Sequence, residues 1–335
     1  MKRHIYILAL AIASLLAASC DKEIGTVDFN EQPRLIINSL MTANDTANFV
    51  ELHLTGNTET KPVKGAQVRI FVNGSLSEEV TSQSSTYMIK SQFESGDKVK
   101  IEAKTDKYEA SAEVVVPDTV EVLSIDSVEV VMYDKYHYAQ HFMRYFIRIK
   151  DLSALSETKY YRLSVTQEVT TVGAYGVREG VVEQVSYYNK DLYHKYSYSS
   201  DIALSEGEIK KENNFEDVDD IDMVENVYNY YGLFRSSYFK NGEYTLAIDI
   251  KEPYYRSEGY AENIQFEIRS IPRSEYFYLQ AITSFQNYEE GYALSPTPIV
   301  PSNVNGGTGI FSVSAMAKAV VTRDLLKIKK GAKIW

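Results

Sequence analysis

The stretch that decides the fold is Lys98-Val99-Lys100-Ile101-Glu102-Ala103, in which charged and apolar residues alternate. Alternation with a period of two places the apolar side chains on one face of a β-strand and the charged ones on the other. Short segments of this kind recur along the chain, separated by turn dipeptides such as Asn73-Gly74 and Gly96-Asp97. We therefore expect a small β-sandwich over residues 33–117. Its predicted strands are residues 35–40, 49–54, 66–72, 86–90, 98–103 and 108–116.

A second β-rich unit is expected over residues 118–326. Val116-Pro117-Asp118 marks the boundary, because proline cannot donate a hydrogen bond to a continuing ladder. A hairpin is predicted through residues 151–158, between two alternating segments. The predicted strands of this unit are residues 142–150, 160–165, 244–250 and 264–270.

One short helix is predicted near the C-terminus. Ser274 is a suitable N-cap, and Gly291 lies beyond the expected end near Gln286. The predicted apolar face consists of Phe277, Ala281, Ile282 and Phe285. Asn305-Gly306-Gly307 then predicts a turn into a closing strand, and residues 327–335 form a basic, loose tail.

Tyrosine is unusually frequent, with 27 residues in the chain. A tyrosine ring packs well across a sheet while its hydroxyl meets water, so the enrichment first indicates two-faced strands. Residues 173–243 lack clean periodicity, which predicts a Tyr-rich and acidic insertion or extended loop. The alternative interpretation is contact with a ligand or partner. The candidate contact residues are Tyr187, Tyr188, Tyr193, Tyr196, Tyr198, Tyr228, Tyr230 and Tyr231.

The first 20 residues resemble a bacterial lipoprotein signal. Basic Lys2 and Arg3 precede an apolar stretch and a small-residue segment that ends at Cys20, the single cysteine of the chain. We expect residues 1–19 to be removed, Cys20 to be attached to lipid and residues 20–32 to form a tether. The alternative is an ordinary signal peptide cut nearby, with an unmodified thiol. The expected location is the outer membrane, with the anchor at the cell surface or in the periplasmic leaflet.

Composition and motifs exclude several classes of function. The formal net charge of -11 disfavours nucleic acid as a partner. The chain lacks the nucleophile elbow, the phosphate-binding loop and the His-Glu-x-x-His motif, so we expect a protein that is not an enzyme and has no cofactor. His137 and His141 fall in a strand-like run that separates them too far for one metal ion. The acidic cluster over residues 216–222 does not follow the calcium-loop template, so a solvated loop is favoured over the alternative of a looser calcium site, and no metal site is expected.

Three tripeptides resemble the Asp-Ser/Thr-apolar acceptor that some Gram-negative bacteria use for O-linked glycans. They are Asp45-Thr46-Ala47, Asp118-Thr119-Val120 and Asp126-Ser127-Val128. Thr46, Thr119 and Ser127 are accordingly candidate glycan acceptors.

Several motifs in order resemble known families. Pro62-Val63-Lys64-Gly65-Ala66 is similar to the opening of transthyretin-like sandwiches, which implies an Ig-like or transthyretin-like first unit. Together with residues 239–244, 270–278 and 302–311, it resembles a family of Gram-negative lipoproteins known as domain of unknown function 4249. Phe234-Arg235-Ser236-Ser237 departs from that family, whose members often carry an aspartate soon after the phenylalanine.

The resemblance implies a role in import. Members of the family are often encoded beside TonB-dependent outer-membrane receptors, so the implied partners are outer-membrane lipid, a TonB-dependent β-barrel receptor and a small nutrient. The family supplies no catalytic residues to transfer. The alternative is a structural surface protein, such as an adhesin or a fimbrial-type subunit, which would also be lipidated and rich in strands.

Overall fold

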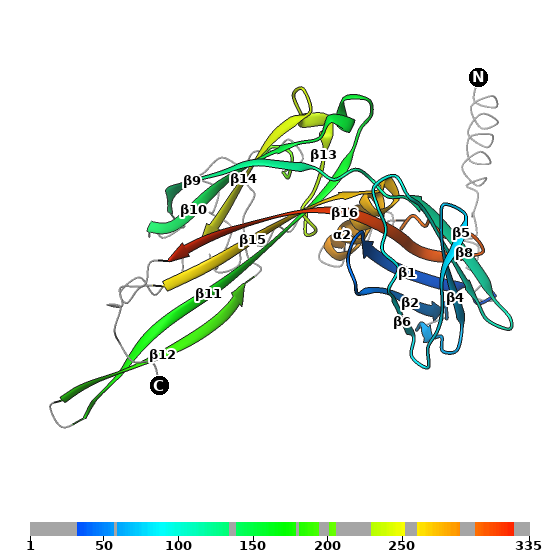
Figure 1. The fold of residues 1–335 in the computed structure, drawn as a ribbon, viewed down its shortest axis with the longest axis horizontal. Coiled ribbons are helices and arrows are strands. Elements are labelled where there is room, and N and C mark those ends of the chain that lie inside the picture. The colour runs from blue at the N-terminus through cyan, green and yellow to red at the C-terminus, as the bar shows by residue number, and fades with distance from the viewer. Residues whose placement is uncertain are drawn as a thin grey trace, which may run out of the picture.

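The protein is described by a computed structural model, which defines residues 32–56, 59–133, 139–178, 181–193, 201–205, 229–251, 260–288 and 299–324. Within these residues it is mainly β, with a single α-helix near the C-terminus (Figure 1). The predicted fold class is therefore confirmed. No described helix combines the length and the apolar character needed to cross a bilayer.

The first unit is a sandwich of two layers of strands. One layer is a four-stranded sheet in the order β5-β4-β7-β8. Its strands are β4 (Gln67–Val72), β5 (Ser75–Thr81), β7 (Lys98–Lys104) and β8 (Glu109–Val115). The other layer contains β1 (Leu35–Thr42), β2 (Asn48–Leu54), β3 (Lys61–Pro62) and β6 (Thr86–Ile89).

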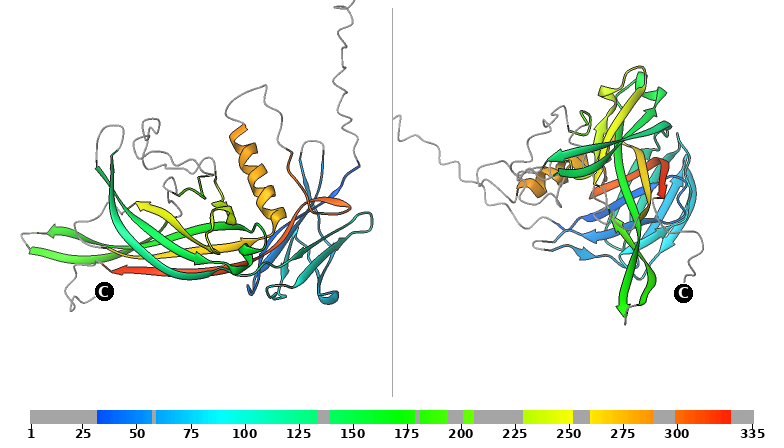
Figure 2. Two further views of the ribbon diagram at one scale, coloured as in Figure 1. Left: turned by 90° about the horizontal axis from the view of Figure 1, so that it is seen from above. Right: turned by 90° about the vertical axis from the view of Figure 1, so that its left-hand side faces the viewer.

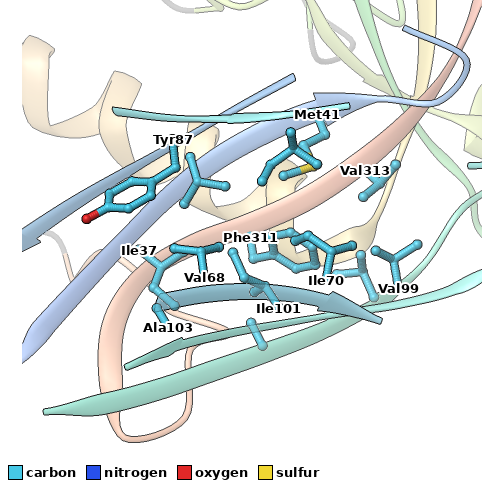
Figure 3. Close-up of a cluster of buried hydrophobic side chains, with 14 of the residues drawn as sticks. Ile37, Met41, Val68, Ile70, Tyr87, Val99, Ile101, Ala103, Phe311 and Val313 are labelled. Atoms are coloured by element: carbon cyan, nitrogen blue, oxygen red, sulfur yellow. The ribbon is translucent and has the colours of Figure 1, made fainter. Parts of the chain in front are cut away.

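The alternation in β7 has the predicted consequence. Val99, Ile101 and Ala103 are fully buried, and they belong to the cluster that also contains Ile37 and Phe311 (Figure 3). All six strands expected in this unit are present. Strand β5 was not expected, because its sequence is polar and lies largely exposed on an edge of the sheet.

The second unit also has two layers. A three-stranded sheet in the order β14-β10-β9 contains β9 (Glu121–Tyr133), β10 (Ala139–Lys150) and β14 (Glu243–Lys251). The other layer contains β11 (Tyr160–Arg178), β12 (Val181–Tyr193), β13 (Leu233–Arg235), β15 (Tyr260–Ile271) and β16 (Gly307–Asp324). The two layers share one apolar cluster, in which the rings of Tyr145 from β10 and Phe266 from β15 lie 5.4 Å apart.

Strand β16 belongs to both units. Its residues 307–314 pair in parallel with β1, and its residues 315–324 pair antiparallel with β15. A boundary at Pro117 alone therefore misplaces residues 307–314, whose side chains Phe311 and Val313 complete the core of the sandwich. A Cβ atom at Gly309 would lie 2.2 Å from the carbonyl oxygen of Ile37, so glycine allows the close approach of β16 to β1.

Two predictions for the second unit are wrong. Residues 151–158 do not form a hairpin: β10 and β11 lie in different sheets and are joined through the 3-10 helix η1 (Leu152–Leu155). Residues 173–193 are not an irregular insertion, because β11 and β12 pair over most of their length as a long hairpin. That hairpin projects at the end of the molecule opposite the sandwich (Figure 1). Residues 194–200 and 206–228 lie outside the described part of the chain.

Helix α2 (Arg273–Tyr288) confirms the predicted helix but not its predicted face. Tyr276, Leu279 and Thr283 are buried, whereas Phe277 and Ile282 are only half-buried. The helix rises from the sheet and contacts β16 and β11 (Figure 2). The periodicity alone did not reveal this face, because a polar threonine occupies one of its positions.

Candidate functional site

A hollow of about 360 Å³ lies at the start of α2. We call it the α2 hollow; it is lined by Arg273, Ser274, Phe277, Pro301, Ser302 and Asn303. The guanidinium carbon of Arg273 lies 5.3 Å from the centre of the Phe277 ring, a cation–π arrangement. The residues around the hollow thus include a positive charge, an aromatic ring and small polar groups.

One wall of the hollow is fixed by the edge of β16. The Asn303 side-chain amide donates to the carbonyl oxygen of Phe311 at 2.7 Å, and the Phe311 N–H donates to the Asn303 Oδ1 atom at 3.0 Å. This pair of bonds satisfies backbone groups of Phe311 on a side of β16 that no described strand pairs with at this point, and it holds residue 303 in place. The wall is therefore anchored to the strand that also completes the sandwich core.

Aromatic rings surround the base of α2. The ring of Tyr160 lies 4.8 Å from that of Tyr276 and 5.8 Å from that of Phe277. Tyr231 and Tyr278 pack against the same cluster, and burial raises the pKa of each of their hydroxyls. At neutral pH these hydroxyls remain protonated, so they can donate hydrogen bonds.

A buried carboxylate ties α2 to two strands. Glu275 is 1% exposed, and the Ser312 hydroxyl of β16 donates to its Oε2 atom at 2.6 Å. The Arg162 guanidinium of β11 lies 3.4 Å from its Oε1 atom. Burial raises the pKa of Glu275, and Arg162 and Ser312 offset part of that effect by stabilising the charge. Because it is shielded from solvent, Glu275 positions the helix and does not itself face the α2 hollow.

The structure brings together only part of the predicted tyrosine set. Tyr230 is 65% exposed, and its ring meets that of Tyr231 edge to face at 5.3 Å, beside α2. Three others lie on β12, where Tyr187 pairs with Gly173, Tyr188 with Val172 and Tyr193 with Gln167. Tyr196, Tyr198 and Tyr228 lie outside the described residues.

The other predicted positions are scattered. Thr46, Thr119 and Ser127 are exposed, and Cys20 lies outside the described residues. The His141 Nδ1 atom lies 3.2 Å from a Glu129 carboxylate oxygen. His137 and the acidic cluster over residues 216–222 are not described. Among the described residues, no three His, Cys, Asp or Glu side chains are grouped so that they could hold a metal ion.

Sequence reasoning missed the polar residues of this region. Arg273, Asn303 and Glu275 are ordinary surface residue types, and nothing local marks one of them as buried and two as lining a hollow. The useful signal was Ser302-Asn303, a turn-forming pair just ahead of the closing strand, which indicates a fixed loop.

Comparison with known proteins gives one assignment. No curated protein matches the chain. The model of the family described as Domain of unknown function (DUF4249) matches residues 22–319, which include almost all of the residues discussed above. Because this match spans most of the sequence, the chain belongs to the DUF4249 family.

Proposed function

We propose that the protein is a lipid-anchored accessory of the outer membrane that partners a TonB-dependent receptor in the capture or uptake of a small nutrient, without catalysing a reaction. The observation that carries the proposal is the placement of two elements. The chain enters the fold at β1 in the sandwich, directly after the expected tether, whereas the β11–β12 hairpin projects at the opposite end (Figure 1).

This layout suits a tethered binding protein. Attachment through Cys20 would confine the protein to the membrane surface and raise its effective concentration at a receptor there, so a weak direct contact would suffice. The projecting hairpin would then be the element that reaches the receptor. The α2 hollow, with Arg273 and Phe277, would be the seat of the nutrient.

The proposal is tested by purification from native outer membranes in mild detergent, with tagged full-length protein and identification of partners by mass. We expect a TonB-dependent barrel in stoichiometric amount, and we expect it to be lost with Cys20→Ala. Copies of the protein itself, or no partner, would instead favour a structural surface protein.

A variant with a shortened β11–β12 hairpin distinguishes the role of the lipid anchor from the role of direct contact with the receptor. Replacing residues 174–186 by Asn-Gly keeps Gly173 paired with Tyr187 as the last rung and removes the projecting part. We expect this variant to remain lipidated and folded, with an unchanged thermal midpoint, but to lose the barrel. Retention of the barrel would show that the hairpin is not the contact.

A further inference from the structure

Two sheet edges in the described part of the chain are partly covered. On β8, Ser111 exchanges two backbone hydrogen bonds with Asn305, at 2.9 and 2.7 Å. On β14, the Ala247 N–H donates to the Asp201 carboxylate at 2.8 Å. Such cover prevents an edge from pairing with another chain.

Strand β9 is different. It is the outer strand of its sheet and is 13 residues long. No residue that the structure describes forms a backbone hydrogen bond with its outer side. Ser127 and Glu129 stand opposite Tyr145 and Met143, yet they are exposed. Among the described strands, the second half of β16 pairs with β15 only, and its Arg323 lies 2.8 Å from Glu262 of that strand.

One acid of β9, Glu129, lies 3.2 Å from the His141 ring of β10, whereas the arginines and the lysine of β10 lie against acids of β14. The three basic residues of β10 bind acids of β14: Arg144 lies 2.7 Å from Asp249, and Arg148 and Lys150 lie 2.6 and 3.8 Å from Glu243. Glu121 and Asp126 of β9 form no ion pair with any described residue.

Strand β9 therefore presents acidic groups together with an apolar surface. Its sequence contains no lysine, arginine, proline or glycine. Val128 and Val131 are each 46% exposed. The common devices that block an edge, lysine and proline, are both missing from this strand.

We propose that β9 is a docking edge for an extended segment of another protein, in which basic and apolar residues alternate and which adds to the β14-β10-β9 sheet as a further strand. The backbone N–H and C=O groups on the outer side of β9 can form hydrogen bonds with an extended backbone. The acidic side chains of β9 favour lysine or arginine on the added strand. A second copy of this chain is the poorer occupant, because two β9 strands would bring like charges face to face. This inference does not rest on the proposed function, since β9 is separate from both the hairpin and the α2 hollow.

The first test uses full-length protein in mild detergent and a labelled peptide of alternating lysine and valine, about nine residues long. Fluorescence anisotropy should show saturable binding. The peptide with glutamate in place of lysine should bind at least about tenfold more weakly. The lysine peptide with every backbone nitrogen methylated keeps its charge but loses its donors, so it should not bind. Equal binding of the methylated peptide would reduce the contact to charge attraction and overturn strand addition.

Variants of the protein locate the site. Asp126→Lys should weaken the lysine peptide about tenfold, whereas Glu79→Lys, an equal charge change on exposed β5, should leave its affinity unchanged. Amide hydrogen exchange should slow on β9 when the peptide is bound. Equal losses in both variants would assign the binding to net charge. Concentration-dependent dimers of the protein alone that Asp126→Lys abolishes would assign the edge to a second copy and overturn the proposal. The hairpin-shortened variant should bind the peptide as the full-length protein does, so the two proposals can fail separately.

Discussion

The sandwich and the second unit bury different kinds of side chain. The sandwich core is apolar, and its ion pairs, such as Lys98 with Glu113, lie outside that core. Every buried carboxylate in the described residues lies in the second unit or on α2: Asp151, Asp201, Asp249, Glu262 and Glu275. The sandwich thus depends on hydrophobic burial, and the second unit depends in addition on paired internal charges.

The substitution with the largest expected effect on stability, Phe311→Ala, tests whether the two units are independent of each other. Phe311 is fully buried in the sandwich although it follows the second unit in the sequence. Phe311→Ala should lower the free energy of unfolding by about 3–5 kcal/mol and speed amide exchange in β7, because it leaves a cavity. Urea denaturation with hydrogen exchange provides the measurement. Val320→Ala on the exposed part of β16 should change stability by less than about 0.5 kcal/mol, and a similar loss in both variants would contradict the assignment.

The next largest effect is expected from removing a buried charge in the second unit, compared with removing an exposed charge in the sandwich. Asp249 is fully buried and binds Arg144 through two hydrogen bonds of 2.7 and 3.1 Å. Asp249→Ala should cost about 3 kcal/mol, because it leaves a largely buried guanidinium without this carboxylate. Glu113→Gln in the sandwich should cost less than about 1 kcal/mol, because that pair is solvated. Equal losses on chemical denaturation would show that the two units do not differ in this respect.

The smallest effect concerns pH. A carboxyl whose pKa is raised by folding stabilises the protein most below the pKa of the unfolded chain, and this stability is lost as the pH rises through the folded pKa. The raised pKa of Glu275 therefore predicts that Glu275→Gln gains stability relative to the unaltered protein as the pH rises above 4.5, the ordinary pKa of a glutamate. Urea denaturation at a series of pH values measures the difference.

Ser312→Ala provides the complementary variant for Glu275. It removes a hydrogen bond that lowers this pKa, so it should steepen the loss of stability with rising pH. A shallower loss, or a Glu275→Gln variant that loses relative stability as the pH rises, would contradict the assigned cause.

Local signals predicted the parts of the fold that depend on local physics. Alternation located β7, and Asn73-Gly74 forms the predicted turn with both residues at positive φ, 51° and 83°. Residues 151–158 were mistaken for a hairpin, because two alternating segments close in sequence usually pair. Here Asp151 instead accepts hydrogen bonds from the Ser153 N–H and the Tyr161 hydroxyl and fixes a crossing between sheets.

The candidate site was harder to predict than the fold. The α2 hollow joins residues 273–277 to residues 301–303, and sequence spacing does not show that these segments meet. Tyr230 and Tyr231 were selected for their ring chemistry and do lie beside α2, whereas the burial of Glu275 depends on Ser312 and Arg162 from distant strands. Contacts between residues far apart in the sequence therefore decide whether a polar residue lines the hollow or is buried behind it.

The parallel pairing of β1 with β16 constrains the order of folding. The Ser314 hydroxyl bonds the carbonyl oxygen of Met41 across 273 positions of sequence. By a random-chain estimate, closing a loop of that length costs on the order of 5 kcal/mol of entropy before the contact forms. The first sheet therefore cannot be completed until residue 314 has been synthesised, and topologies of this kind fold slowly. A chain that emerges stepwise, from a ribosome or across a membrane, would keep residues 35–42 without their parallel partner until residue 314 has appeared, and apolar side chains exposed during that interval would be prone to aggregation.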